Sequence, residues 1–239
     1  MPRKVHEPLK ERYHEDDYYI EIGIDEAGRG PLFGRVYTGA VILPKTDFDF
    51  SKMKDSKKFS SEKKIQEVAE YIKENAIAWA VSYNDEKTID KINIRQSVLD
   101  SMHKSIKSIL RERKEEKEHD EHDEHDEHDE HDENYFLLVD GNDFKPYITI
   151  KNGAFIPLPY KCIESGDDTY CAIAAASILA KVERDKYIKE LCEENPILKE
   201  NYGIDKNKGY GTKQHLEGIK NNGITKWHRK TYGICKDFC

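Results

Sequence analysis

Two adjacent carboxylates, Asp25 and Glu26, are the residues best suited to chemistry at the start of this chain. They follow residues 20–24, where isoleucines alternate with Glu and Gly at the period of a β-strand. Acids at the end of a core strand are costly unless something binds them. A metal cation is the simplest partner for such a pair.

Two later segments also present acids at the ends of expected elements. Asp140 closes the apolar run 135–139, which predicts a buried strand, and Asp167 or Asp168 precedes a strongly helical run. Adjacent strand ends converge at one edge of the sheet in an α/β protein, where acids can share hard divalent ions such as Mg²⁺ or Mn²⁺. Two such ions would activate a water and stabilise the leaving oxygen in phosphodiester hydrolysis.

Each acid also has a purely structural interpretation. Asp25 can cap a turn, Asp140 with its following glycine is a turn signal, and Asp167 can be a helix N-cap. The joint set is favoured because the chain has no Cys/His zinc spacing, no GxSxG elbow and no Walker glycine loop to compete with it.

The elements that must position these acids follow from periodicity and turn residues. The first strand leads through a glycine-rich loop into a returning strand at 36–43. Further along the chain we expect helices at 61–75, from about 93 into the charged run after 111, at 170–191 and at 215–220, with strands at 77–83 and 135–139 and short strands and turns at 146–163.

Composition places the 239 residues in one large domain or two small ones. No apolar run approaches the length of a membrane span, and the charged N-terminus has no signal-peptide pattern, so we expect a cytoplasmic protein with no membrane partner. Five cysteines with no CxxC pair favour a reducing compartment.

Residues 118–133 form a Glu-His-Asp repeat, and the acids of this repeat account for the negative overall charge of −8. The repeat holds 11 of the 47 acids and no Lys or Arg, so the rest of the chain has a net charge of +3, which is compatible with a polyanionic partner. The repeat has no apolar face and is interpreted as a solvated insertion or helix extension. A metal-buffering tract is the alternative, since its histidines lie beside carboxylates.

Five segments together resemble the ribonuclease HII family, the type 2 ribonucleases H. They occur in the order of that family between residues 20 and 230: IGIDEAGRGPLFGRV, DSKKFS, LLVDG, GDDTYCAIAAASILAKVERD and NKGYGT with a following His215. The resemblance implies an α/β, ribonuclease H-like fold in which a mixed central β-sheet is flanked by helices and followed by a C-terminal helical extension.

The resemblance also implies a division of the chain. A ribonuclease H-like catalytic domain at 18–195 would contain the charged low-complexity insertion at 112–134. A C-terminal extension at 196–239 would contact substrate, and residues 1–17 would be a flexible charged tail. A monomer is expected.

Carried over to this chain, the family motifs imply catalytic and metal-binding roles for Asp25, Glu26 and Asp140. In the family motif a Gly-Asp pair precedes the AAAS run at a fixed distance. That pair aligns with Gly166-Asp167 here, so the fourth acid is Asp167 rather than Asp168. These acids would hold Mg²⁺ or Mn²⁺ in a two-ion mechanism. The backbone of Gly28, Arg29 and Gly30 would read the ribose 2′-hydroxyl, which separates RNA from DNA.

The resemblance and the chemistry of the side chains add further contacts to substrate. Tyr210 would stack on the deoxyribose after the RNA–DNA junction, and Lys57 and Ser177 would also bind substrate. Four more residues are candidates for phosphate contacts or for an ordinary solvated charged surface: Lys181, Arg184, His228 and Arg229. Arg35 departs from the family, which usually has proline there, and is expected to alter the hairpin slightly or to add a phosphate contact.

The expected function is metal-dependent endonucleolytic cleavage of RNA in RNA–DNA hybrids and on the 5′ side of ribonucleotides embedded in duplex DNA, leaving 5′-phosphate and 3′-hydroxyl ends. A non-enzymatic nucleic-acid or metal-binding module, with the repeat as its working part, is a rival. A DNA-cutting nuclease of the same superfold is another.

Overall fold

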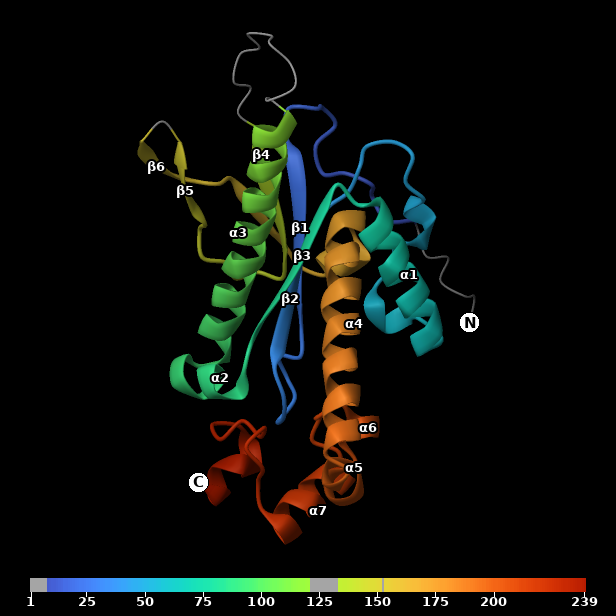
Figure 1. Cartoon of the computed structure of the whole chain (residues 1–239), viewed down its shortest axis with the longest axis vertical. Coiled ribbons are helices and arrows are strands. Elements are labelled where there is room, and N and C mark those ends of the chain that lie inside the picture. The colour runs from blue at the N-terminus through green and yellow to red at the C-terminus, as the bar shows by residue number, and fades with distance from the viewer. Residues whose placement is uncertain (1–7, 121–132, 152) are drawn as a thin grey trace.

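A mixed five-stranded sheet forms the centre of the computed structural model, which describes residues 8–120, 133–151 and 153–239 (Figure 1). The strands lie in the order β3-β2-β1-β4-β7, with β2 antiparallel to both β1 and β3 and with β4 parallel to both β1 and β7. Their bounds are β1 Ile20–Ala27, β2 Val36–Ile42, β3 Ala78–Asn84, β4 Tyr135–Asp140 and β7 Tyr160–Ile163.

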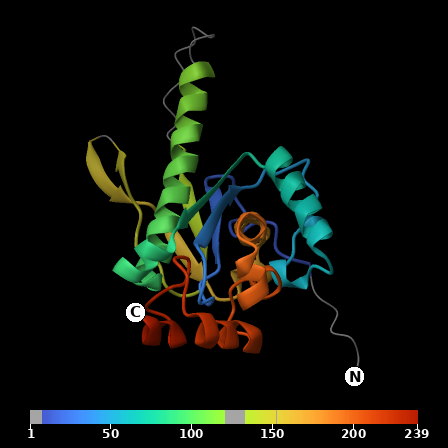
Figure 2. The ribbon, with the colours of Figure 1, turned by 60° about the horizontal axis from the view of Figure 1, so that its bottom comes forward.

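Helices cover both faces of this sheet, so the expected fold class is confirmed. The long helix α3 lies on one face, and α1 and α4 lie on the other, as Figures 1 and 2 both show. The helices that precede the C-terminal extension are α1 Glu62–Asn75, α2 Glu86–Ile92, α3 Ile94–Asp120 and α4 Cys171–Glu194.

Small residues let α4 press directly onto the sheet. A Cβ atom added to Gly23 of β1 would lie 2.1 Å from the carbonyl carbon of Ala172, and one added to Gly39 of β2 would lie 2.3 Å from the carbonyl oxygen of Ala176. Real side chains do not fit at such distances. The close approach predicted from the alanine run is therefore what the structure shows, and it anchors the start of α4 beside the end of β1.

The C-terminal extension packs as a small helical unit against the second half of α4 (Figure 1). Its elements are α5 Ile197–Tyr202, α6 Ile204–Asn207, α7 Lys213–Asn222 and the 3-10 helix η4 Gly233–Phe238. The apolar cluster that holds the extension also takes in Phe33, from the loop between β1 and β2. The extension is thus joined to that loop as well as to α4.

Between β3 and β7 the structure has one unexpected helix and the short strands that were expected. The short helix α2 between β3 and α3 was not expected, although Asp85 caps it by accepting from the amide of Thr88 at 2.9 Å. The short strands expected after residue 146 include an antiparallel hairpin, β5 Ile148–Lys151 and β6 Ala154–Pro157, that stands off the main sheet (Figure 2). Neither element bears on the position of the acids.

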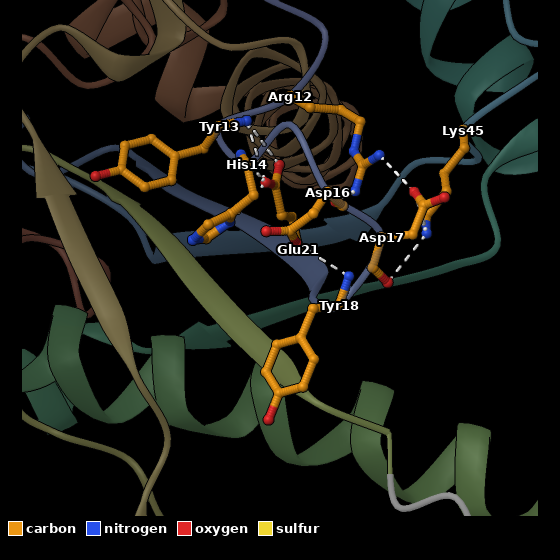
Figure 3. Close-up of polar contacts among 8 residues, drawn as sticks. All are labelled: Arg12, Tyr13, His14, Asp16, Asp17, Tyr18, Glu21 and Lys45. Carbon is orange, nitrogen blue, oxygen red and sulfur yellow. Dashed lines mark hydrogen bonds and ion pairs between the residues drawn. The ribbon is translucent and has the colours of Figure 1, made fainter.

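Residues 8–17, expected as part of a flexible tail, are tied to the body of the molecule. The amide of Lys10 donates to the carbonyl of Thr169 at 2.8 Å, and the amide of Cys171 donates to the carbonyl of Lys10 at 2.9 Å. Glu21 of β1 accepts hydrogen bonds from the amides of Tyr13 and His14 (Figure 3). These contacts differ from the expectation, because the backbone of a free tail would bond only to water.

The Glu-His-Asp repeat is only partly described. Helix α3 continues to Asp120, so the first residues of the insertion extend that helix, as one interpretation predicted. Residues 121–132, and with them the metal-buffering alternative, lie outside the described residues. Within the described ranges, no helix combines the length and the hydropathy that a membrane span needs.

Candidate active site

The three acids at strand ends lie side by side at one edge of the sheet. Strands β1 and β4 are parallel neighbours, and their last paired residues are Ile24 and Val139. The next residue on each strand is Asp25 or Asp140, so the register itself places these two acids together. Glu26 follows on β1, and its carboxylate lines the same open pocket as Asp140.

The fourth acid is brought to this edge by a main-chain hydrogen bond. The amide of Gly166 donates to Oδ1 of Asp140 at 2.7 Å. Gly166 begins the 3-10 helix η3 Gly166–Asp168, whose next residue, Asp167, is 7% exposed. The short turn therefore places Asp167 beside Asp140, and the negative charge of Asp140 contributes to a raised pKa of Asp167, after burial as the main cause.

Asp167 and Asp168, the two candidates for the fourth acid of the site, lie in different environments. Asp167 is buried at the edge of the sheet, and its Oδ2 lies 3.4 Å from Nζ of Lys57. Asp168 is exposed and pairs with Lys58 instead. The geometry therefore favours Asp167, as the family motif implied.

Burial and mutual repulsion dominate the electrostatics of the acids. Burial raises the pKa of Asp25 well above its usual range, and the charges of Glu26 and Asp140 raise it further. Burial also raises the pKa of Glu26, an effect that the Arg29 guanidinium opposes from 3.5 Å. A cation among these groups would lower the free energy of their charged forms.

The donor set suits a hard divalent ion, because it consists of carboxylate oxygens next to an open pocket. In the arrangement found here, no three acidic, imidazole or thiol side chains of the described residues lie close enough together to hold one ion. Their nearest partners are instead cations, a hydroxyl and amide groups. A bound cation would offset the repulsion between the acids.

Ser177 differs from its expected role. It was expected to bind substrate, but it is 4% exposed in the first half of α4. Its hydroxyl lies 3.0 Å from that of Ser56 and forms a hydrogen bond to Asp25 that lowers the pKa of that acid. The position of Ser177 suits it to orient Asp25. Its link to Ser56, 121 positions away, has no local signal in the sequence.

The loop from Gly28 to Arg35 begins directly after the acids and meets the extension. The amide of Leu32 donates to the carbonyl of Gly209 at 2.9 Å, and a Cβ added to Gly30 would lie 3.6 Å from the ring of Tyr210. Gly30 and Tyr210 are both exposed. The two parts of the predicted substrate surface, 180 positions apart in sequence, thus lie against each other.

Three residues considered as phosphate contacts or surface charges are neither. Arg184, His228 and Arg229 are 3%, 1% and 0% exposed. Both arginines donate to carbonyl groups of the loop, and His228 bonds to His215. Sequence patterns missed this because a mixture of basic and aromatic residues is also typical of a nucleic-acid surface. Of the remaining candidates, Lys57 is 79% exposed in its side chain and Lys181 pairs with Asp185 at 2.7 Å.

Arg35, expected to alter the hairpin slightly or to add a phosphate contact, packs between two aromatic rings. Its guanidinium lies 4.1 Å from the ring centre of Tyr83 and 4.3 Å from that of Tyr187. Stacking on two aromatic rings stabilises a partly desolvated cation. The departure from proline therefore adds a packing contact at the end of the hairpin.

Comparison with known proteins gives one consistent result. A family model described as ribonuclease HII matches residues 22–234. The chain is 43% identical over 215 residues to the ribonuclease HII of Parabacteroides distasonis and 40% identical over 218 residues to that of Bacteroides fragilis, and these alignments cover 90% and 91% of both chains. Its fold is similar to the crystal structure of ribonuclease H2 from Pyrococcus horikoshii, with a TM-score of 0.65, 19% identity, and coverage of 91% of this chain and 96% of that one.

Proposed function

The chain belongs to the ribonuclease HII family and is a ribonuclease H, and on that premise we propose that it is a metal-dependent endonuclease that cuts RNA in RNA–DNA hybrids and on the 5′ side of a ribonucleotide embedded in duplex DNA. The observation that carries the proposal is the juxtaposition of two features on one strand. The acids Asp25 and Glu26 end β1, and the loop that contains Gly28 and Gly30 starts immediately after them. A group that reads the sugar therefore lies next to the groups that act on its phosphate.

Asp25, Glu26, Asp140 and Asp167 would hold Mg²⁺ or Mn²⁺ in this proposal. When bound, such ions supply the positive charge that makes water a nucleophile and stabilises the oxygen that leaves. The protein contributes the orientation of the acids. Ser177 and the amide of Glu26 bond to Asp25, and the amide of Gly166 fixes one oxygen of Asp140.

The backbone of the loop would recognise the ribose. No hydrogen bond to the amides of Arg29 and Gly30 occurs within the described ranges, and both residues are exposed. These amides are donors suited to a sugar hydroxyl, and glycine permits the close approach that such a contact needs. The 2′-hydroxyl is the group that distinguishes a ribonucleotide from its deoxy neighbours.

Tyr210 would complete the recognition by stacking on the deoxyribose that follows the ribonucleotide. Tyr210 is 52% exposed and its ring lies against Gly30, so it is available to a substrate that occupies the loop. Cleavage on the 5′ side of the ribonucleotide would leave a 3′-hydroxyl on one product and a 5′-phosphate on the other. Every group in this scheme comes from one chain, which supports action as a monomer.

A matched pair of variants tests the metal site on an RNA–DNA hybrid. Asp25→Asn removes a charge from the acid set, and Asp168→Asn removes the neighbouring charge that pairs with Lys58 outside it. We expect Asp25→Asn to lose at least about 10³-fold in kcat/KM, because an ion site contributes several kcal/mol to such a reaction. Asp168→Asn should stay close to wild type. Full activity of Asp25→Asn would overturn the assignment.

A further inference from the structure

The loop Gly28–Arg35 has an unusual backbone arrangement, because almost all of its carbonyl groups face cationic donors. Arg229 alone uses all five N–H donors of its guanidinium on this loop. The acceptors are the carbonyls of five loop residues at 2.6–3.2 Å, namely Gly28, Arg29, Pro31, Gly34 and Arg35. No single side chain can donate more hydrogen bonds than this.

Arg184 of α4 and the backbone of Arg229 supply most of the remaining bonds. Arg184 donates to the carbonyls of Phe33 and Arg35 at 3.4 and 3.3 Å. The amide of Arg229 donates to the carbonyl of Leu32 at 2.8 Å. Together the two arginines bond to the carbonyl of every residue from 28 to 35 except Gly30.

Both guanidinium groups are buried, and neither forms an ion pair with a carboxylate within the part of the chain that the structure describes. Buried charges normally have a counter-ion, so the carbonyl dipoles of the loop take that place here. Burial lowers the pKa of Arg229 to about 10. Because this value is still well above neutral pH, the guanidinium stays charged. The charge and the loop conformation therefore depend on each other.

Close packing and backbone conformation both require glycine at position 28, the first residue of the loop. Gly28 has φ +91°, a region that favours glycine, and a Cβ there would lie 2.1 Å from Nε of Arg184. While the carbonyls are bonded to the arginines, the amides of Arg29 and Gly30 have no partner among the described residues. The loop thus keeps most of its carbonyl acceptors occupied, while the amides of Arg29 and Gly30 stay available.

We propose that Arg229 and Arg184 are positioning residues that hold the loop Gly28–Arg35 in the conformation that recognises the ribose, so that these two arginines contribute to sugar specificity without touching the ribose. This inference rests on the proposed function of the loop. A lysine in place of either arginine keeps a positive charge but cannot donate in a fork, and it leaves several buried carbonyls without a donor.

The test measures discrimination as well as turnover. For wild type, Arg229→Lys and Arg184→Lys, binding to a DNA duplex with one ribonucleotide is compared with binding to the same duplex made entirely of DNA, in Ca²⁺ so that turnover is suppressed. Cleavage of the first duplex in Mg²⁺ gives kcat/KM, and each variant is assayed well below its own melting temperature.

We expect Arg229→Lys to lose most of the preference for the ribonucleotide, by about tenfold or more, with all-DNA binding unchanged, and to lower kcat/KM about a hundredfold. Arg184→Lys should shift both quantities in the same direction by less, because it loses fewer bonds to the loop. Arg113→Lys is the matched control, since Arg113 is a half-buried arginine bonded to Glu116 and Glu133, away from the loop. It should lower the melting temperature and leave the preference intact.

The outcomes separate the inference from the proposed function. A wild-type protein that neither prefers nor cuts the ribonucleotide duplex contradicts the proposed function. A wild-type protein that does both, with lysine variants that keep the full preference, overturns the inference. If Arg229→Lys does not fold, Arg184→Lys alone decides, and an unchanged preference in that variant overturns the inference.

Discussion

Oδ1 of Asp140 accepts a hydrogen bond of 2.7 Å from the amide of Gly166, which joins the end of β4 to the turn that carries Asp167. The bond occupies one oxygen of the carboxylate and leaves Oδ2 without a hydrogen bond among the described residues. Two acids that lie 27 positions apart are therefore brought together by the main chain. The relationship gives a direct way to separate the structural and the chemical roles of Asp140.

Two substitutions of Asp140 are expected to differ in stability but not in activity. Asp140→Asn keeps an acceptor for Gly166 and removes the charge, so it should fold as stably as wild type. Asp140→Ala also leaves the buried amide unpaired, which costs about 1–3 kcal/mol. Both should lower kcat/KM on an RNA–DNA hybrid by at least about 10³-fold. Chemical unfolding and steady-state kinetics check the two parts, and equal stability of the variants would contradict the role of the hydrogen bond.

Asp25→Asn is expected to make the protein more stable when no divalent ion is present. Burial and the charges of Glu26 and Asp140 destabilise the ionised Asp25, whereas asparagine carries no charge. The gain should be about 1 kcal/mol, a size typical of functional sites that are relieved of strain. Melting in EDTA measures it. Added Mn²⁺ should then raise the melting temperature of wild type more than that of the variant, and the reverse order would argue against a metal site at Asp25.

Gly28→Ala should reduce both stability and activity, because Gly28 has φ +91° and its Cβ would overlap Arg184. The strain is expected to cost about 1–3 kcal/mol. Gly223 is a matched control in the extension, with φ +74° but no atom closer than 4.0 Å to its added Cβ. Gly223→Ala should therefore lose some stability and keep kcat/KM. Similar kinetics for the two variants would show that the loop tolerates displacement.

A buried histidine pair in the extension predicts a loss of stability in mild acid. Nδ1 of His215 lies 2.9 Å from the carbonyl of Tyr210 and must donate to it, so its Nε2 accepts from Nε2 of His228 at 3.0 Å. Nδ1 of His228 in turn accepts from the amide of Thr225. Both rings are therefore neutral, and burial together with His215 lowers the pKa of His228 to about 3.

The sign of this pH effect follows from where the proton binds. Below the ordinary histidine pKa of about 6.5, these histidines are protonated in the unfolded chain but stay neutral in the folded protein. Because the unfolded state then binds more protons, the free energy of unfolding falls as pH drops from 7 to 5. The slope should approach about 1.4 kcal/mol per pH unit for each histidine at the acid end of that window. Urea unfolding measures it, with His103→Gln as a control that keeps the slope. A stability that does not change over this range would contradict the neutral pair.

The acids and the strand that carries them could be predicted because their signals are local. Alternation in β1 and the apolar run of β4 predicted the strands, and acids at both strand ends predicted their meeting. The expectation for Asp167 needed the family motif, because a turn with two adjacent acids offers no local way to choose between them. The alanine run at 174–176 also predicted close packing, which the structure shows between Gly39 and Ala176.

The roles of Arg229, Arg184 and Ser177 could not be predicted, because each depends on partners far away in the chain. Arg229 bonds to Gly28, 201 positions earlier, whereas the basic and aromatic residues around it in sequence have a composition typical of a protein surface. Whether a charge is solvated or buried is decided by tertiary packing rather than by its neighbours in sequence. The same holds for residues 8–17, whose mixed charges indicated a tail although their backbone bonds to the start of α4.

Cleavage of a DNA duplex that contains a single ribonucleotide is the most direct test of the proposed function. Two duplexes of identical sequence are compared in Mg²⁺ or Mn²⁺, one with a single ribonucleotide and one made entirely of DNA, and the products are mapped at nucleotide resolution. The proposed function predicts one cut on the 5′ side of the ribonucleotide, with 3′-hydroxyl and 5′-phosphate ends, and no cut in the all-DNA duplex. Equal cutting of the two duplexes, or no cutting of either by a protein that still cleaves an RNA–DNA hybrid, would contradict it.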